Sequence, residues 1–178
     1  MAYFDECKRA MDYLGQDPRT LFMGQSVAYK GTAITTQLKD VPAEKKLELP
    51  VCEEMQMGMG IGMALEGFVP ILIYPRWNFL LLAANQLINH LDKFNYFTHG
   101  DKNINVIIKV TAGSAHPLFP GHQHVGDYGD AFRMMLEQVE VIQLQEPEQV
   151  FSSYEYALQR IDNKPTLLVE YGDYYTEK

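Results

Sequence analysis

Two short stretches of the sequence concentrate side chains that can exchange protons, and the first holds a pair of carboxylates. In "LPVCEEMQMGMGIGMALEG", residues 49–67, Glu53 and Glu54 stand side by side at the start of a glycine-rich apolar run. Either they stabilise the first turn of a helix by their negative charge, or one of them handles a proton at the end of a strand. On spacing alone the helix-start interpretation is favoured, because acids are common in first turns.

The second stretch is the loop "TAGSAHPLFPGHQH", which places His116, His122 and His124 within nine residues. Imidazole titrates near neutrality, so a small change of environment switches its charge. An ordinary surface position is the alternative for each histidine, and it is favoured for His116. His122 and His124 also form a His-x-His pair that suits zinc, but no further cluster of ligands supports such a site. We therefore predict no metal site on this chain.

The elements that must position these residues follow from the alternation of apolar runs with amphipathic stretches. This alternation is typical of a parallel sheet with helices on both faces. We predict one α/β domain over residues 1–178, with a mostly parallel sheet of about six strands and a small helix in the loop 30–46. Strands are expected at 20–24, 47–51, 68–74, 104–110, 139–144 and 166–172, and helices at 2–14, 54–66, 79–97, 129–138 and 147–160. Ligands of such sheets bind beyond the carboxyl ends of the strands.

Composition excludes several classes of function. A formal charge of −8 over 178 residues argues against nucleic acid as a partner, because phosphate binding needs a basic surface. The apolar run at 79–84 is followed at once by polar residues and cannot supply the roughly 20 apolar residues of a membrane span. With only two cysteines and no signal peptide at the start of the chain, we expect a cytoplasmic protein.

The order of motifs along the chain resembles the pyrimidine-binding domain of thiamine-diphosphate enzymes, over about residues 3–173. The nearest branches are the beta subunit of 2-oxo acid dehydrogenases and the middle domain of transketolases. No single motif is decisive, and the resemblance rests on order and spacing. The segments that carry it are "LPVCEEMQMGMGIGMALEGFVPILIYPRWNFLLLAANQLINHLDKF", "VIIKVTAGS", "GHQH", "VEVIQLQEPEQV" and "KPTLLVEYGD".

This resemblance reverses the interpretation of Glu53 but not that of Glu54. Glu53 matches the family acid that hydrogen-bonds the aminopyrimidine of thiamine diphosphate and favours the imino tautomer that activates the cofactor. Phe79 matches the aromatic residue that packs on the pyrimidine, and a core phenylalanine is its alternative. His124 matches the histidine that faces the substrate. Two further cofactor contacts are expected from the same resemblance, at Gln25 and Val51.

Two features depart from the family pattern, and two of its parts are missing. Leu82 replaces a polar residue, and "RWN" before Phe79 is unusual. The Gly-Asp-Gly motif that holds the diphosphate and Mg²⁺ does not occur in this chain, nor does the transketolase C-terminal domain. The resemblance therefore implies that a separate diphosphate-binding subunit holds Mg²⁺ and shares the cofactor.

We expect this chain to be a subunit of a split transketolase-like or 2-oxo acid dehydrogenase-type enzyme, inactive alone, that acts on a small ketone or 2-oxo acid. The alternative is a non-catalytic structural or regulatory subunit with the same fold. A small-molecule-binding α/β domain unrelated to thiamine is a third interpretation.

The glycines after Glu53 indicate how such a subunit assembles. Glycine costs about 1 kcal/mol relative to alanine inside a helix, so Gly58, Gly60 and Gly62 need a reason. A phosphate-binding loop is a weak explanation, because the lysine of such a loop is missing. Gly58 and Gly62 share one helix face, which lets another backbone approach. We expect a homodimer contact through the helices at 54–66 and 79–97.

Overall fold

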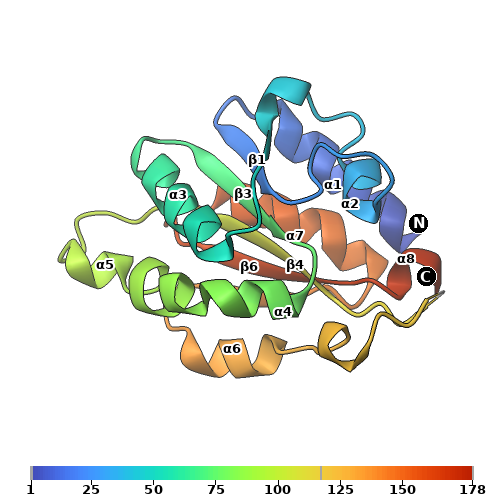
Figure 1. The fold of residues 1–178 in the computed structure, drawn as a ribbon. Helices are drawn as coiled ribbons and strands as arrows, with labels where there is room; N and C mark the ends of the chain where they lie inside the picture. The colour runs from blue at the N-terminus through green and yellow to red at the C-terminus, as the bar shows by residue number, and fades with distance from the viewer. Residues whose placement is uncertain (1, 117, 178) are drawn as a thin grey trace.

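The computed structural model describes residues 2–116 and 118–177, and a six-stranded sheet forms its centre (Figure 1). All neighbouring strands are parallel, in the order β2-β1-β3-β4-β6-β5. β3 and β4 are buried along their whole length, as expected for central strands covered on both faces. The strands are β1 Thr20–Gly24, β2 Lys46–Glu48, β3 Val69–Tyr74, β4 Ile107–Ala112, β5 Glu140–Gln143 and β6 Thr166–Tyr171.

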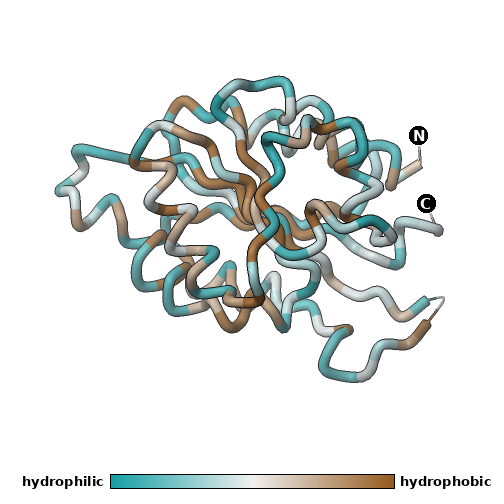
Figure 2. The backbone as a smooth tube through the Cα atoms, turned by 45° about the horizontal axis from the view of Figure 1, so that its top comes forward, coloured by the Kyte–Doolittle hydropathy of each residue, from teal (hydrophilic) through white to brown (hydrophobic). Residues whose placement is uncertain are grey.

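Helices cover both faces of this sheet. α1, α2, α7 and α8 pack on one face, and α3, α4 and the segment that follows α4 pack on the other. Figure 2 shows apolar residues concentrated along the strands between these layers. The helices are α1 Tyr3–Gln16, α2 Ala33–Gln37, α3 Glu53–Leu65, α4 Trp77–Leu80, α5 Phe94–Phe97, α6 Gly129–Met135, α7 Pro147–Gln159 and α8 Tyr174–Glu177, with short 3₁₀ helices η1 Ala43–Lys45, η2 Leu81–Ala83 and η4 His122–His124 and a π-helix η3 Gln86–Leu91.

Local sequence explains the two longest helices on the α1 face. α1 buries residues at helical spacing, from Tyr3 through Cys7 and Met11 to Leu14. α7 begins with Pro147 in its first turn and has a capping box between residues 146 and 149. These signals are local, which is why the sequence predicts both helices closely.

The fold class is confirmed, and several boundaries are corrected. β2 ends at Glu48 and not at residue 51, because Pro50 lacks the N–H that a further ladder bond needs. β4 lies two to three residues later than predicted, and α6 stops at Met135. The helix α8 was not predicted. The loop predicted at residues 111–124 includes the short helix η4, and Pro117 within it lies outside the described residues.

The prediction of one helix over residues 79–97 was wrong in its details. The helical segment begins at Trp77 and passes through 3₁₀ and π turns before α5. In the π turn the N–H of Asp92 donates to the carbonyl of Leu87 at 2.9 Å. Asp92 is buried, and its carboxylate accepts hydrogen bonds from three consecutive backbone N–H groups at 137–139, between 2.8 and 2.9 Å. This buried carboxylate fixes the segment to the turn before β5.

Candidate functional site

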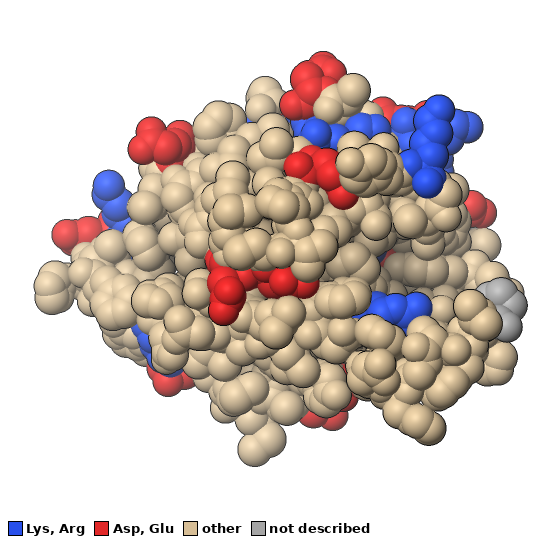
Figure 3. Space-filling model, viewed as in Figure 1, with Lys and Arg blue, Asp and Glu red and all other residues tan. Residues whose placement is uncertain are grey.

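The candidate site lies at the carboxyl edge of the sheet, where the segments after β1, β3 and β4 meet. Strands that run parallel bring these segments to one edge, as expected for a ligand site of this fold class. Long-range contacts show the meeting: Gln56 bonds to the carbonyls of Met23 on β1 and Ile73 on β3, and Arg76 after β3 bonds to Gly113 after β4. Figure 3 shows a group of acidic side chains beside the start of α3 and a hollow below α2.

Glu53 is the first residue of α3 and is only 4 % exposed, whereas Glu54 points outward. Among the described residues, the Glu53 carboxylate accepts no hydrogen bond and forms no ion pair. No described side chain caps this helix start. The backbone carbonyl of Glu53 accepts a hydrogen bond from the Tyr74 hydroxyl at 3.2 Å. Burial, and then the nearby Glu53 charge, raise the pKa of Tyr74. Both acids thus lie in the first turn of α3, where negative charge is favourable, and they differ in their burial.

Gln56, one turn after Glu53, fixes the start of α3 to the sheet. Its buried Nε2 donates to the carbonyls of Met23 at 3.2 Å and Ile73 at 3.0 Å, at the ends of β1 and β3. Its Oε1 accepts from Gln25 Nε2 at 3.3 Å. Gln25 is thus tied to the same helix start as Glu53. Val51, the other residue predicted there, is 77 % exposed.

Phe79 and His124 lie together on the other side of the site. Their ring centroids are 6.0 Å apart at an interplanar angle of 45°. His124 Nδ1 lies 3.1 Å from Asn78 Oδ1. An amide oxygen can only accept, so Nδ1 carries the proton in this contact and Nε2 of the neutral ring is left as a proton acceptor. α4 thus provides both the aromatic neighbour and the anchor of the histidine.

Arg76 holds the histidine loop to the end of β4. Its NH1 donates to the carbonyl of Gly113 at 2.6 Å and to that of His124 at 3.0 Å. Burial lowers the pKa of Arg76, and the nearby charge of Asp173 opposes this shift. Asp173 holds the same loop from β6, where it accepts from the backbone N–H groups of residues 115 and 116 at 2.8 and 3.1 Å.

The predicted residues therefore form two groups. Gln25 and Glu53 meet through Gln56, and Phe79 meets His124, but no hydrogen bond or ring contact joins the groups within residues 2–116 and 118–177. Sequence reasoning missed Gln56, Arg76, Asn78 and Asp173. The signal for two of them was present, because the "RWN" triplet supplies both side chains that hold His124 and its loop.

The described residues can also be compared with the requirements of a metal site and of a membrane-spanning helix. In the described part of the chain, no three side chains of histidine, cysteine, aspartate or glutamate gather closely enough to bind a metal ion. His116 is exposed, and its Nδ1 lies 3.5 Å from Asp173 Oδ1. No described helix has the length and apolar character needed to span a bilayer.

Comparison with known proteins places this architecture. Residues 1–175 match the family described as "Transketolase, pyrimidine binding domain". The chain belongs to this family, which confirms the predicted resemblance. The fold and the family thus define the class of protein to which the chain belongs.

Particular relatives refine the comparison. A pyruvate dehydrogenase E1 component subunit beta of Gracilaria tenuistipitata var. liui is 27 % identical over 98 % of this chain and 54 % of its own length. A chloroplastic subunit beta-3 of Arabidopsis thaliana is 33 % identical over 61 % of this chain and 28 % of its own. The chain thus spans about half or less of the length of these relatives.

Two solved structures share the fold. A split-gene transketolase, solved as an inactive beta4 tetramer, matches with a TM-score of 0.73 and 18 % identity, over 96 % of this chain and 51 % of that chain. The transketolase of Leishmania mexicana matches with a TM-score of 0.72 and 16 % identity, over 96 % of this chain and 25 % of that one. At these identities the likeness concerns the fold alone.

Proposed function

We propose that this chain is the pyrimidine-binding subunit of a thiamine-diphosphate enzyme of the transketolase or 2-oxo acid dehydrogenase type. The observation that carries the proposal is Glu53, a buried carboxylate without a hydrogen-bond partner among the described residues, at the carboxyl edge of the sheet. A carboxylate that the fold leaves without a partner keeps its full hydrogen-bonding capacity for a ligand.

The residues present fit the aminopyrimidine ring of the cofactor. Glu53 offers an acceptor or, when protonated, a donor to a ring nitrogen. Phe79 is half-buried, and its aromatic ring is of a type that packs against a flat heterocycle. Gln25 and Val51 border the same helix start as Glu53. When bound, thiamine diphosphate supplies the nucleophilic carbon that attacks the carbonyl of a ketone or 2-oxo acid.

The chain itself contributes proton handling and orientation. Glu53 would hold a proton at a ring nitrogen of the bound cofactor, and its low exposure of 4 % would strengthen that contact. His124 Nε2, left free by the Asn78 contact, accepts or returns a proton at the substrate. Phe79 fixes the position of the ring beside this histidine.

We also propose that a second chain completes the active site. That chain would hold the diphosphate and Mg²⁺, while residues 1–178 form a single pyrimidine-binding domain. The described part of this chain contains no cluster of metal ligands. Matched relatives named as subunits, and a split-gene transketolase with a similar fold, support a divided enzyme. A cytoplasmic location stays a prediction, since some of the matched relatives are chloroplastic or mitochondrial proteins.

We propose in addition a homodimer contact through α3 and residues 79–97. Met55 and Met59 are partly exposed along α3, and Leu82 is 57 % exposed on the neighbouring segment. A side chain added at Gly58 or Gly62 would meet no atom within 4 Å, whereas one at Gly60 would strike Leu72. The open glycines thus lie on the outer face, where close approach of a second helix is possible.

Gly62→Leu tests this contact. The variant should fold, because its position is open and leucine favours helix over glycine, but its dimer should weaken by about tenfold or more. Sedimentation equilibrium gives the dissociation constant, and Ser152→Leu, an exposed position on α7, is the control of equal bulk. Unchanged assembly of Gly62→Leu would exclude this face as the interface.

The function is tested by co-expressing this chain with each candidate diphosphate-binding chain from its genomic neighbourhood. With thiamine diphosphate and Mg²⁺, the complex should consume a 2-oxo acid or transfer a ketol group, and this chain alone should not. Turnover by the isolated chain would overturn the divided enzyme. A stable complex that never turns over would favour the alternative, a structural or regulatory subunit.

A further inference from the structure

A small cavity lies next to the candidate site, on the α2 side of the carboxyl edge. It has a volume of about 210 Å³ and lies between the segment after β1, the start of the α4 segment and the ends of β4 and β6. It therefore accepts a group of a few heavy atoms and is too small for a whole cofactor. Figure 3 shows the surface hollowed below α2, with a basic side chain on the lower wall.

Arg76 is the one charged residue that lines this cavity, and no acid lines it. Its NH1 bonds to the carbonyls of Gly113 and His124, and no described carboxylate lies within ion-pair distance of the guanidinium. The remaining N–H groups of the guanidinium thus have no protein acceptor in the described residues. Such a fork of donors matches the oxygens of a carboxylate or a phosphate.

Two hydroxyls beside Arg76 are also available. Ser26 and Ser114 line the cavity, and neither hydroxyl has a partner among the described residues. Ser26 has a positive φ of 64°, and its N–H donates to the Glu48 carboxylate at 2.7 Å, which fixes this backbone. Tyr175 on the opposite wall donates its proton to Glu170, so it cannot donate to a ligand. The donors therefore gather at the Arg76 end.

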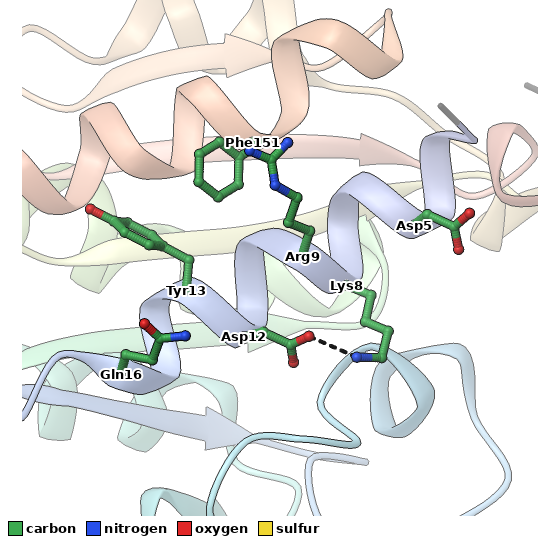
Figure 4. Close-up of a pocket in the computed structure, with 7 residues that line it drawn as sticks. All are labelled: Asp5, Lys8, Arg9, Asp12, Tyr13, Gln16 and Phe151. Atoms are coloured by element: carbon green, nitrogen blue, oxygen red, sulfur yellow. Dashed lines mark hydrogen bonds and ion pairs between the residues drawn. The ribbon is translucent and has the colours of Figure 1, made fainter.

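A larger hollow of the described surface, along α1, lacks this property. It has a volume of about 460 Å³, lies along α1 beside Phe151 and is drawn in Figure 4. Its basic residues are already paired: Lys8 with Asp12 at 2.7 Å, and Arg9 with Glu6 at 3.0 Å. Neutralised charges and an open outer surface give no reason for an anion to bind there.

We propose that the cavity at Arg76 binds the anionic group, carboxylate or phosphate, of the substrate. This inference deepens the proposed function and relies on it for the identity of the ligand, but not for the binding itself. Because the same guanidinium holds the carbonyl of His124, an anion bound to Arg76 is coupled to the histidine loop.

Arginine side-chain NMR of the full chain, without cofactor or partner, tests the site. The Nε–Hε signal of Arg76 is followed during titration with inorganic phosphate, pyruvate and ribose 5-phosphate, with sodium chloride replaced to keep the ionic strength constant. We expect a saturable shift of this signal. Tighter binding of the two phosphates assigns a phosphate-bearing substrate, and tighter binding of pyruvate assigns a 2-oxo acid.

Variants separate this site from general charge effects. Calorimetric binding should weaken about tenfold or more in Arg76→Gln and remain unchanged in Arg9→Gln. Ser26→Ala keeps the charge and both loop contacts and should weaken binding by a smaller factor, which also covers the case in which Arg76→Gln fails to fold. Absence of a saturable shift with all three probes, or equal binding by Arg76→Gln, would overturn the proposal. Binding without turnover in any complex would count against the proposed function only.

Discussion

Glu53 and Glu170 are both buried glutamates, but their surroundings differ completely. Glu170 on β6 is 0 % exposed and accepts hydrogen bonds from Tyr154 at 2.6 Å, Tyr175 at 2.5 Å and Gln37 at 3.1 Å. It also forms an ion pair with Lys109 on β4, in which the ammonium has no well-aligned hydrogen bond. Glu53 is 4 % exposed and has no such partner among the described residues.

This difference separates a carboxylate that the fold satisfies from one that it leaves available. Burial disfavours the Glu170 carboxylate, but Lys109 and the tyrosine hydroxyls outweigh it and hold the pKa of Glu170 below its ordinary value. A carboxylate satisfied on every side links the layers of the fold and has no capacity left for a ligand. Glu53 keeps that capacity because the fold leaves it unpaired.

The largest expected effect is on stability in Glu170→Gln. This variant leaves the Lys109 ammonium buried without a counter-charge, which should lower the free energy of unfolding by about 3–5 kcal/mol. Urea denaturation measures the loss. The double variant Lys109→Met with Glu170→Gln should recover most of it, because no uncompensated charge remains. A single variant as stable as wild type would remove the structural role assigned to Glu170.

Glu53→Gln should show the opposite profile. Since the Glu53 carboxylate has no partner to lose, the free energy of unfolding of the variant should change by less than about 1 kcal/mol. The activity of the assembled enzyme should fall by roughly a hundredfold or more. Glu54→Gln, at the exposed neighbouring position, is the matched control and should leave stability and activity unchanged. If Glu53→Gln unfolds as readily as Glu170→Gln, the comparison between the two glutamates fails.

Removing the tyrosine hydroxyl that donates to each glutamate sharpens the comparison. Tyr154→Phe deletes a bond to a buried charge and should cost about 1.5–3 kcal/mol. Tyr74→Phe deletes a bond to the neutral carbonyl of Glu53 and should cost about 1 kcal/mol. Thermal and urea unfolding of the two variants give the ranking. A larger loss in Tyr74→Phe would show that the Glu53 region carries more of the stability than its contacts indicate.

The pH dependence of stability tests the assignment of Glu170 in a second way. The pKa of Glu170 is lower in the folded chain than its ordinary value of 4.5, so its stabilisation is present above that value and is lost as the pH falls toward the folded pKa. In that window Glu170 should contribute a slope of up to about 1.4 kcal/mol per pH unit. Other acids also contribute, so the measurement is the difference in slope between wild type and the double variant. Equal slopes in the two proteins would contradict the shift.

Local patterns account for much of what the sequence predicted. The parallel α/β class, the helix α7 and the fully buried strand β3 follow from periodicity and capping. The segment after Phe79 was predicted less well, because its π turn depends on a carboxylate that bonds to a distant backbone. A helical irregularity that depends on such a distant contact cannot be deduced from the spacing of apolar residues.

By itself, the sequence determined the alternation of elements, the place of the two glutamates at a helix start and the family resemblance that gave Phe79 and His124 their expected roles. Only the tertiary structure decided which buried charges are satisfied. Lys109 meets Glu170 at a separation of 61 positions in the sequence, and Arg76 meets His124 at a separation of 48, through contacts that no local pattern encodes. The physical reason is that burial and pairing depend on which strands become neighbours, and only the packed sheet fixes that choice.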